Sequence, residues 1–158
     1  MTTKKHIISS LPLGAVYYFV TRNAWFALVA AFSSIVIDVD HCLDYLITQK
    51  RIGALRNMIE SFNTFEIVTK NYLLLHSWEL VIIFGIFLIF YHSPFLIAIF
   101  TGYVFHLFLD QIFNTQFLGK YNSKDFFYFF FYRKIHNFDV LPLRKNESSI
   151  NPKERIYA

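Results

Sequence analysis

Cysteine and charged residues are scarce in this chain. Cys42 is the single cysteine among 158 residues, so a disulfide framework and a zinc ribbon or finger, which all need several cysteines, are excluded. Charged residues make up 16% of the chain and hydrophobic residues 55%, whereas soluble domains carry about 25% charged and about 45–50% apolar residues. Together with a mean hydropathy of +0.39, this composition excludes a disordered chain and a coiled coil and favours a membrane protein.

Four apolar runs, separated by polar residues, follow one another along the sequence: 6–21, 24–41, 72–91 and 95–113. The first two runs are joined by Arg22-Asn23 and are at the short end of the roughly 17–25 residues that span hydrocarbon. Pro94 precedes the last run and is suited to begin a helix, because its φ is fixed and the first turn does not need its N–H. The sequence therefore predicts two helical hairpins.

The segments outside these runs are more polar or strongly aromatic. Between residues 52 and 66, apolar positions recur every three or four residues among charges, which predicts an amphipathic helix on the membrane surface. Seven successive aromatic residues at 126–132 are typical of the headgroup layer. We therefore expect an all-α polytopic membrane bundle of about four transmembrane helices plus an interfacial amphipathic helix. It divides into a membrane-embedded domain at 1–118 and an aromatic interfacial segment with a polar tail at 119–158.

Basic residues are distributed unequally between the two ends of the predicted helices. With four crossings, all of the 15 Lys and Arg residues except Arg22 fall on one side. Loops rich in Lys and Arg stay in the cytoplasm, so this distribution predicts a protein of the cytoplasmic (inner) membrane with both termini in the cytoplasm. The net charge of +4 is then explained by topology, which removes the main argument for a nucleic-acid partner.

Ionisable residues within the apolar runs gather at helix ends that the predicted topology places at one level: His6, Asp38, Asp40, His41, Asp44, His76, Glu79, His106 and Asp110. Each costs about 2.5–3.5 kcal/mol near hydrocarbon, so such groups usually face a bundle interior and mark a site. His106 and Asp110 are four residues apart and His76 and Glu79 three apart, so each pair shares a helix face. Imidazoles and carboxylates without thiolates are ligands for zinc, manganese or iron.

Four motifs follow in a fixed order: His6, Asp38-Val39-Asp40-His41, His76-Ser77, and Gly102-Tyr-Val-Phe-His106-Leu-Phe-Leu-Asp110. This order, over roughly residues 1–115, resembles the YdjM-like family of inner-membrane metal-dependent hydrolases, which is in turn similar to the all-helical zinc-dependent phospholipase C. The resemblance implies five metal ligands: His6, Asp40, His76, His106 and Asp110. Ile37 stands where the family often has proline, and Lys70-Asn71-Tyr72 stand where it commonly has His-Arg, so one family histidine has no counterpart.

The other polar residues complete this hypothesis. Glu79 replaces the missing ligand or acts as the general base, and Asp38 is the second candidate for the base. His41, Asp44 and Asn114 are expected to orient the metal ligands through hydrogen bonds, without binding the metal themselves.

The function predicted is hydrolysis of a phosphoester in a membrane lipid or lipid-linked substrate at the cytoplasmic face, with zinc as the expected metal and manganese or iron as alternatives. Two other classes remain open. One is a membrane anchor or assembly protein with a structural metal or a His/Asp network. The other is a metal or proton transporter, against which the clustering of ionisable groups at one end counts.

Overall fold

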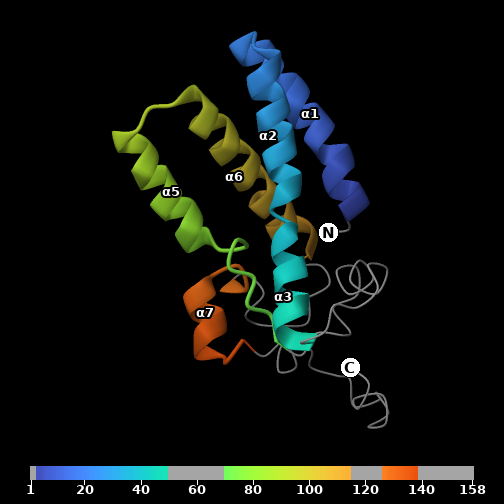
Figure 1. The fold of residues 1–158 in the computed structure, drawn as a ribbon, viewed down its shortest axis with the longest axis vertical. Coiled ribbons are helices and arrows are strands. Elements are labelled where there is room, and N and C mark those ends of the chain that lie inside the picture. The colour runs from blue at the N-terminus through green and yellow to red at the C-terminus, as the bar shows by residue number, and fades with distance from the viewer. Residues whose placement is uncertain (1–2, 50–69, 115–125, 139–158) are drawn as a thin grey trace.

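The computed structural model describes residues 3–49, 70–114 and 126–138, and the regular secondary structure of these residues is helical, without a β-strand (Figure 1). The helices are α1 (Thr3–Thr21), α2 (Ala24–Val36), α3 (Val39–Gln49), α5 (Trp78–Phe90), α6 (Pro94–Asn114) and α7 (Phe130–Ile135). The all-α prediction is therefore confirmed for the described part of the chain. The predicted amphipathic helix at 52–66 lies outside it.

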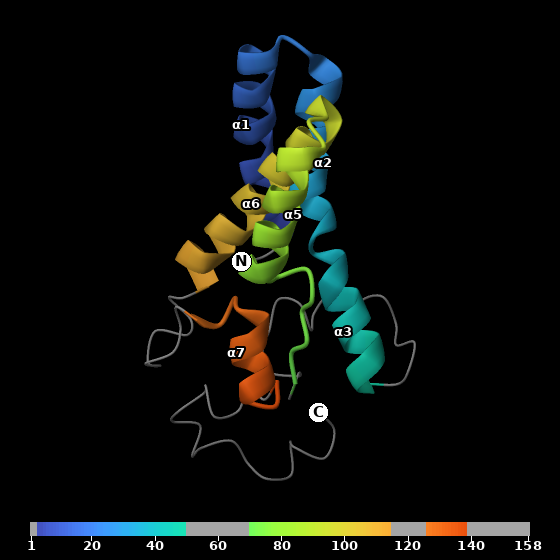
Figure 2. The ribbon, with the colours of Figure 1, turned by 90° about the vertical axis from the view of Figure 1, so that its left-hand side faces the viewer.

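Helix α2 is the centre of the bundle. It packs along both α1 and α6, while α5 packs on α6, and α1 and α6 contact each other only slightly. The turn between α1 and α2 and the turn between α5 and α6 lie at the same end of the bundle, opposite α3 and α7 (Figures 1 and 2). Both predicted hairpins are thus present. In the first hairpin, Asn23 caps the N-terminus of α2, because its side chain accepts hydrogen bonds from the backbone N–H groups of Trp25 and Phe26.

Small residues allow α2 and α6 to approach closely. Ala30, Ser33 and Ser34 of α2 are buried, and a Cβ added to Gly102 of α6 would overlap the Oγ of Ser33 and the carbonyl oxygen of Ala30. The Ser33 hydroxyl lies 3.0 Å from that carbonyl and 3.3 Å from the carbonyl oxygen of Ile99 in α6. Because hydrocarbon offers no hydrophobic drive, close contact between small residues is the usual way for apolar helices to associate.

The predicted helix at 24–41 is broken in the structure. Helix α2 ends at Val36 and α3 begins at Val39, with a two-residue turn at Ile37 and Asp38 between them. The N–H of Asp38 donates to the carbonyl oxygen of Ile35, three residues back, instead of to the fourth. This tighter hydrogen bond leaves the carbonyl oxygen of Ser34 available to another donor.

The predicted run at 72–91 is only partly helical. Helix α5 has 13 residues, or about 20 Å at 1.5 Å per residue, which is shorter than the roughly 30 Å hydrocarbon core. Among the described residues, two helices are long and apolar enough to cross a membrane, Ala24–Ile47 through the turn and Pro94–Phe113. The number of four crossings therefore remains a prediction.

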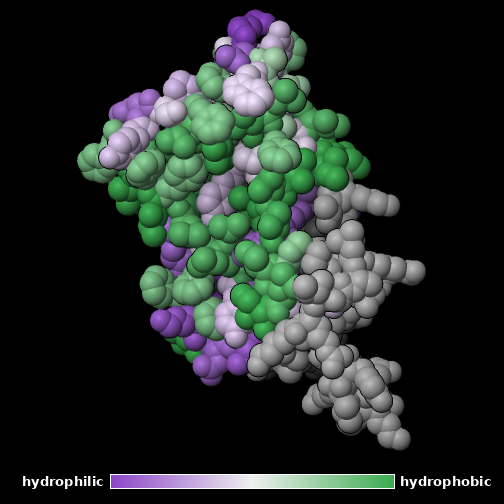
Figure 3. All heavy atoms as spheres, in the orientation of Figure 1, coloured by the Kyte–Doolittle hydropathy of each residue, from purple (hydrophilic) through white to green (hydrophobic). Residues whose placement is uncertain are grey.

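Apolar side chains cover the outside of the helices. Figure 3 shows a largely hydrophobic face over the bundle, with hydrophilic residues gathered at its two ends. The most exposed of these apolar side chains come from several helices, for example Leu11, Val20, Phe32, Ile83 and Phe90. An apolar surface of this extent is unusual for a water-soluble monomer and agrees with a lipid surrounding.

The described part of the tail packs against the segment that precedes α5. Phe127 and Tyr128 are each 1% exposed and form a small core with Leu73 and Trp78. The backbone N–H of Trp78 donates to the carbonyl oxygen of Tyr128 at 3.0 Å. Phe126 is exposed, so only part of the aromatic run predicted to lie in the headgroup layer faces outward.

Candidate metal centre

Five ionisable side chains from four segments meet in the bundle: His6 of α1, Asp38 of the turn between α2 and α3, His76 of the segment before α5, and His106 and Asp110 of α6. Except for Asp38, they are at most 2% exposed. Two sets of three have ligand atoms within 4.8 Å of one another: His6, His106 and Asp110, and Asp38, His76 and His106. The structure therefore brings these five sequence-predicted residues together.

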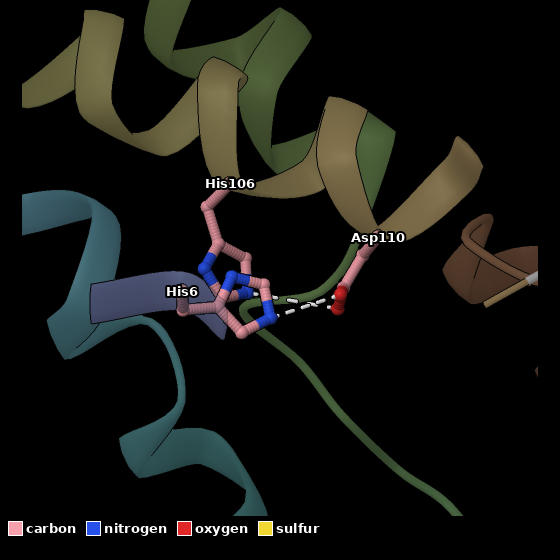
Figure 4. Close-up of side chains that lie close together, drawn as sticks. All are labelled: His6, His106 and Asp110. Carbon is pink, nitrogen blue, oxygen red and sulfur yellow. Dashed lines mark ion pairs between the residues drawn. The ribbon is translucent and has the colours of Figure 1, made fainter. Parts of the chain in front are cut away.

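The first set joins α1 to α6 (Figure 4). The Nε2 of His6 lies 3.1 Å from Oδ1 of Asp110, and the Nε2 of His106 lies 3.6 Å from Oδ2 of the same carboxylate. The rings of His6 and His106 are stacked, with centroids 4.1 Å apart and planes inclined by 17°. Asp110 thus faces both imidazoles.

The second set adds the turn between α2 and α3. Oδ1 of Asp38 lies 3.6 Å from Nε2 of His106 and 3.9 Å from Nε2 of His76. The two Nε2 atoms are themselves 3.1 Å apart. Oδ2 of Asp38 is buried without a hydrogen-bond partner among the described residues.

The backbone fixes how His106 presents its ring. Its Nδ1 lies 2.6 Å from the carbonyl oxygen of Ser34, and a carbonyl oxygen can only accept, so Nδ1 carries the hydrogen. The Nε2 lone pair of the neutral ring then points into the cluster. Because Nε2 has one lone pair, His106 can ligate one ion at a time.

Asp40 lies behind His76 rather than in the cluster. Its Oδ2 is 3.4 Å from Nδ1 of His76 and accepts hydrogen bonds from the backbone N–H groups of Leu75 and His76 at 2.6 and 3.2 Å. A carboxylate on the far nitrogen of a ligating histidine fixes the ring tautomer and orientation. The geometry gives Asp40, predicted as a ligand, the position of a residue that orients one.

Asp44 has a similar place one turn further along α3. Its Oδ1 accepts from the backbone N–H groups of Tyr72 and Leu73 at 3.1 and 3.3 Å. The spacing of four between Asp40 and Asp44 thus places both carboxylates on the face of α3 that holds the segment before α5. Their backbone partners lie in a non-helical stretch, where buried N–H groups need acceptors other than the carbonyl oxygens of a helix.

Glu79 is engaged with the tail. Its two carboxylate oxygens accept hydrogen bonds from the backbone N–H groups of Phe130 and Phe131 at 2.9 and 3.1 Å. These are the first two residues of α7, whose N–H groups have no partner within the helix. The candidate base of the sequence-based hypothesis therefore caps a helix in the structure.

Of the other residues predicted to orient the ligands, His41 lies at the cluster and Asn114 is at the end of α6. His41 lies beside the cluster, with its ring centroid 4.7 Å from that of His76 and its Nε2 4.0 Å from Oδ1 of Asp38. Asn114 is the last residue of α6, and its side chain lies outside the described part of the structure.

Arg133 is a residue that the sequence did not single out. It is 3% exposed, and its guanidinium donates to the carbonyl oxygens of Leu73, His76 and Phe127 at 2.7, 3.0 and 2.7 Å. Burial lowers the pKa of Arg133 to about 10, against an opposing effect of Glu79, so the group stays protonated at neutral pH. No periodic pattern marks such a residue, because its partners are backbone atoms distant in sequence.

Comparison with known proteins gives no further assignment: no family model, no curated protein and no solved structure matches the chain. The resemblance to the YdjM-like hydrolases remains a prediction from the motifs. What the structure establishes is a buried His/Asp group that could hold a metal ion.

Proposed function

We propose that this chain is a membrane-bound metal-dependent hydrolase that cleaves a phosphoester of a lipid or lipid-linked substrate at the cytoplasmic face. The observation that carries the proposal is the 3.1 Å separation of the Nε2 atoms of His76 and His106. Both rings have their Nδ1 atoms directed at acceptors, the Ser34 carbonyl oxygen and the Asp40 carboxylate. Both Nε2 lone pairs therefore face each other, and this arrangement needs a positive charge between them.

A divalent cation fits this requirement. Two imidazole nitrogens that are each about 2.0–2.1 Å from one tetrahedral zinc ion lie roughly 3.3 Å apart, close to the separation of the Nε2 atoms. Asp110 supplies a carboxylate oxygen 3.6 Å from Nε2 of His106, and its other oxygen faces His6. Nitrogen and carboxylate donors without a thiolate suit zinc, manganese or iron.

The chain also supplies a proton acceptor at this position. A divalent ion bound there would polarise a phosphoryl oxygen and acidify a water molecule. Asp38 is the most exposed of the five cluster residues, at 15% of its side chain, whereas its Oδ2 atom is itself buried. Its Oδ2 has no hydrogen-bond partner among the described residues and is free to accept the proton of the attacking water. We therefore assign the general base to Asp38 and the capping of α7 to Glu79.

A lipid substrate is supported by an apolar groove between two helices that also carry cluster residues. An apolar groove of about 310 Å³ is lined by Leu13 of α1 and by Phe100, Thr101, Val104, Phe105 and Phe108 of α6. It lies where α1 and α6 contact each other little, and the contacts of His6 with His106 and Asp110 join the same two helices. An acyl chain in this groove would leave a polar headgroup near the metal ligands.

The test combines metal content and hydrolysis. The detergent-purified protein, loaded with zinc, manganese or iron in turn, is offered a chromogenic phosphodiester and vesicles of defined phospholipids. We expect release of phosphate-containing product in the wild type and none in His106→Ala. Stoichiometric metal without hydrolysis of any phosphoester would contradict the enzymatic assignment.

A second candidate function is favoured by the same short contact. A proton shared between the Nε2 atoms of His76 and His106 would also separate the lone pairs, and the cluster would then be a His/Asp hydrogen-bond network that joins α1, α6 and the segment before α5. This corresponds to a non-enzymatic anchor or assembly protein. It predicts that metal is absent and that His106→Ala mainly destabilises the fold.

A further inference from the structure

The segment that carries His76 has no regular secondary structure of its own. Residues 71–77 are non-helical, and Leu73 has a φ of 39°, a left-handed conformation that costs energy for a residue with a side chain. Leu73 and His76 are nevertheless at most 1% exposed. Something outside the segment must hold this backbone, because buried N–H and C=O groups need partners.

Side chains from three helices supply these partners. Asp40 and Asp44 of α3 accept from the N–H groups of the segment. On the carbonyl side, the hydroxyl of Tyr103 in α6 donates to the carbonyl oxygen of Leu75, and Arg133 of α7 donates to those of Leu73 and His76. The segment is thus held between carboxylates on one side and donors on the other.

Arg133 has the most demanding of these positions. One guanidinium joins two carbonyls of the segment to the carbonyl oxygen of Phe127, and its carbon lies 5.7 Å from the centre of the Phe127 ring. Charge-assisted hydrogen bonds of this kind are about twice as strong as neutral ones. The first turn of α7 is in turn fixed by the carboxylate of Glu79.

We propose that Arg133 is a positioning residue for the metal centre, which holds the backbone of residues 73–76 so that the imidazole of His76 faces His106. The role in metal binding rests on the proposed function, whereas the role in holding His76 does not. Arg133 contacts no ligand atom directly. It acts through the carbonyl oxygen of His76, so its loss should change the geometry of one ligand and leave the others in place.

Cobalt(II) binding to the 158-residue chain in detergent tests this role. We expect Arg133→Met to weaken cobalt affinity about 10- to 100-fold, the range typical of residues that orient ligands, and to give the visible absorption spectrum of His76→Ala. Lys134→Met is the matched control. Lys134 is the next residue in the sequence and is exposed, so this variant removes the same charge and should keep the wild-type affinity and spectrum. Arg133→Lys should restore part of the affinity and of the spectrum.

Wild-type affinity and spectrum in Arg133→Met would overturn the proposal. If the wild type itself binds no cobalt, the proposed function fails, and hydrogen exchange of the peptide that covers residues 71–77 then decides the positioning role. Faster exchange in Arg133→Met than in Lys134→Met supports it, and equal exchange refutes it. Arg133→Lys provides the same comparison if Arg133→Met does not fold.

Discussion

The Nδ1 atom of His106 donates a hydrogen bond to the carbonyl oxygen of Ser34, 2.6 Å away in another helix. In an unbroken helix this carbonyl would accept from the N–H of Asp38, which instead donates to Ile35. The break that brings Asp38 to the cluster therefore also provides the acceptor that orients His106. One local change in α2 supplies both a carboxylate and a fixed imidazole.

Replacement of Asp38 tests the assignment of the general base. We expect Asp38→Asn to retain metal and to lower the rate of phosphoester hydrolysis by about 10²- to 10⁴-fold, because the amide cannot accept the proton of the attacking water. Glu79→Gln is the control. It should retain metal and hydrolysis and reduce the free energy of unfolding by about 1 kcal/mol, because one acceptor at the first turn of α7 is lost. Slower hydrolysis in Glu79→Gln than in Asp38→Asn would instead assign the general base to Glu79.

Replacement of Asp40 tests whether this residue binds the metal directly or orients the ligand His76. Since its Oδ2 contacts Nδ1 of His76 and two backbone N–H groups, Asp40→Asn should weaken metal affinity by about 10- to 100-fold without abolishing binding. Isothermal titration with zinc measures this difference. Complete loss of metal, equal to that in His106→Ala, would show that Asp40 ligates the ion directly.

Glycine substitutions test the close packing of α2 and α6. A Cβ at position 102 would overlap the Ala30 carbonyl oxygen, which is backbone and cannot move aside, so Gly102→Ala should lower the free energy of unfolding by about 1–3 kcal/mol. Gly85→Ala is the matched control, since its Cβ would meet only the Phe100 ring at 3.5 Å, an ordinary contact. Thermal unfolding in one detergent compares them, and equal stability of the two variants would contradict the account of this interface.

The orientation in the membrane is open to labelling. In a Cys42→Ala background, cysteines at Asn23 and Asn146 should react from opposite sides of the membrane, because the positive-inside distribution places position 146 in the cytoplasm. A cysteine at His92 should behave like that at Asn23, since the two turns lie at one end of the bundle (Figure 1). Labelling of Asn23 and Asn146 from the same side would overturn the topology.

The sequence predicted those parts of the fold that local signals mark. Arg22-Asn23 marked the turn between the first two runs, and Pro94 identified the start of α6, because a proline at the first helical position acts within a few residues. The break at Ile37 and Asp38 carried no proline or glycine. The apolar Leu73-Leu74-Leu75 was predicted to be part of a membrane helix, although Leu73 is buried beneath the tail. Hydropathy does not distinguish a lipid-facing helix from a buried non-helical segment.

The sequence predicted which residues form the candidate site better than it predicted how they contact one another. The spacing of His106 and Asp110 on one helix face placed both in the cluster, since helical periodicity fixes such pairs. The positions of Asp40 and Glu79 could not be read in the same way, because they depend on partners more than thirty residues away, namely His76 for Asp40 and the N-terminus of α7 for Glu79. Arg133 was missed for the same reason.

Elemental analysis of the detergent-purified protein, beside His106→Ala and Asp110→Ala, tests the central claim most directly. The account predicts roughly stoichiometric zinc, manganese or iron per wild-type chain and its loss in both variants, with each variant still inserted in the membrane. Absence of metal from the wild type after each ion has been added back would contradict the metal centre. The His/Asp cluster would then be a hydrogen-bond network between helices.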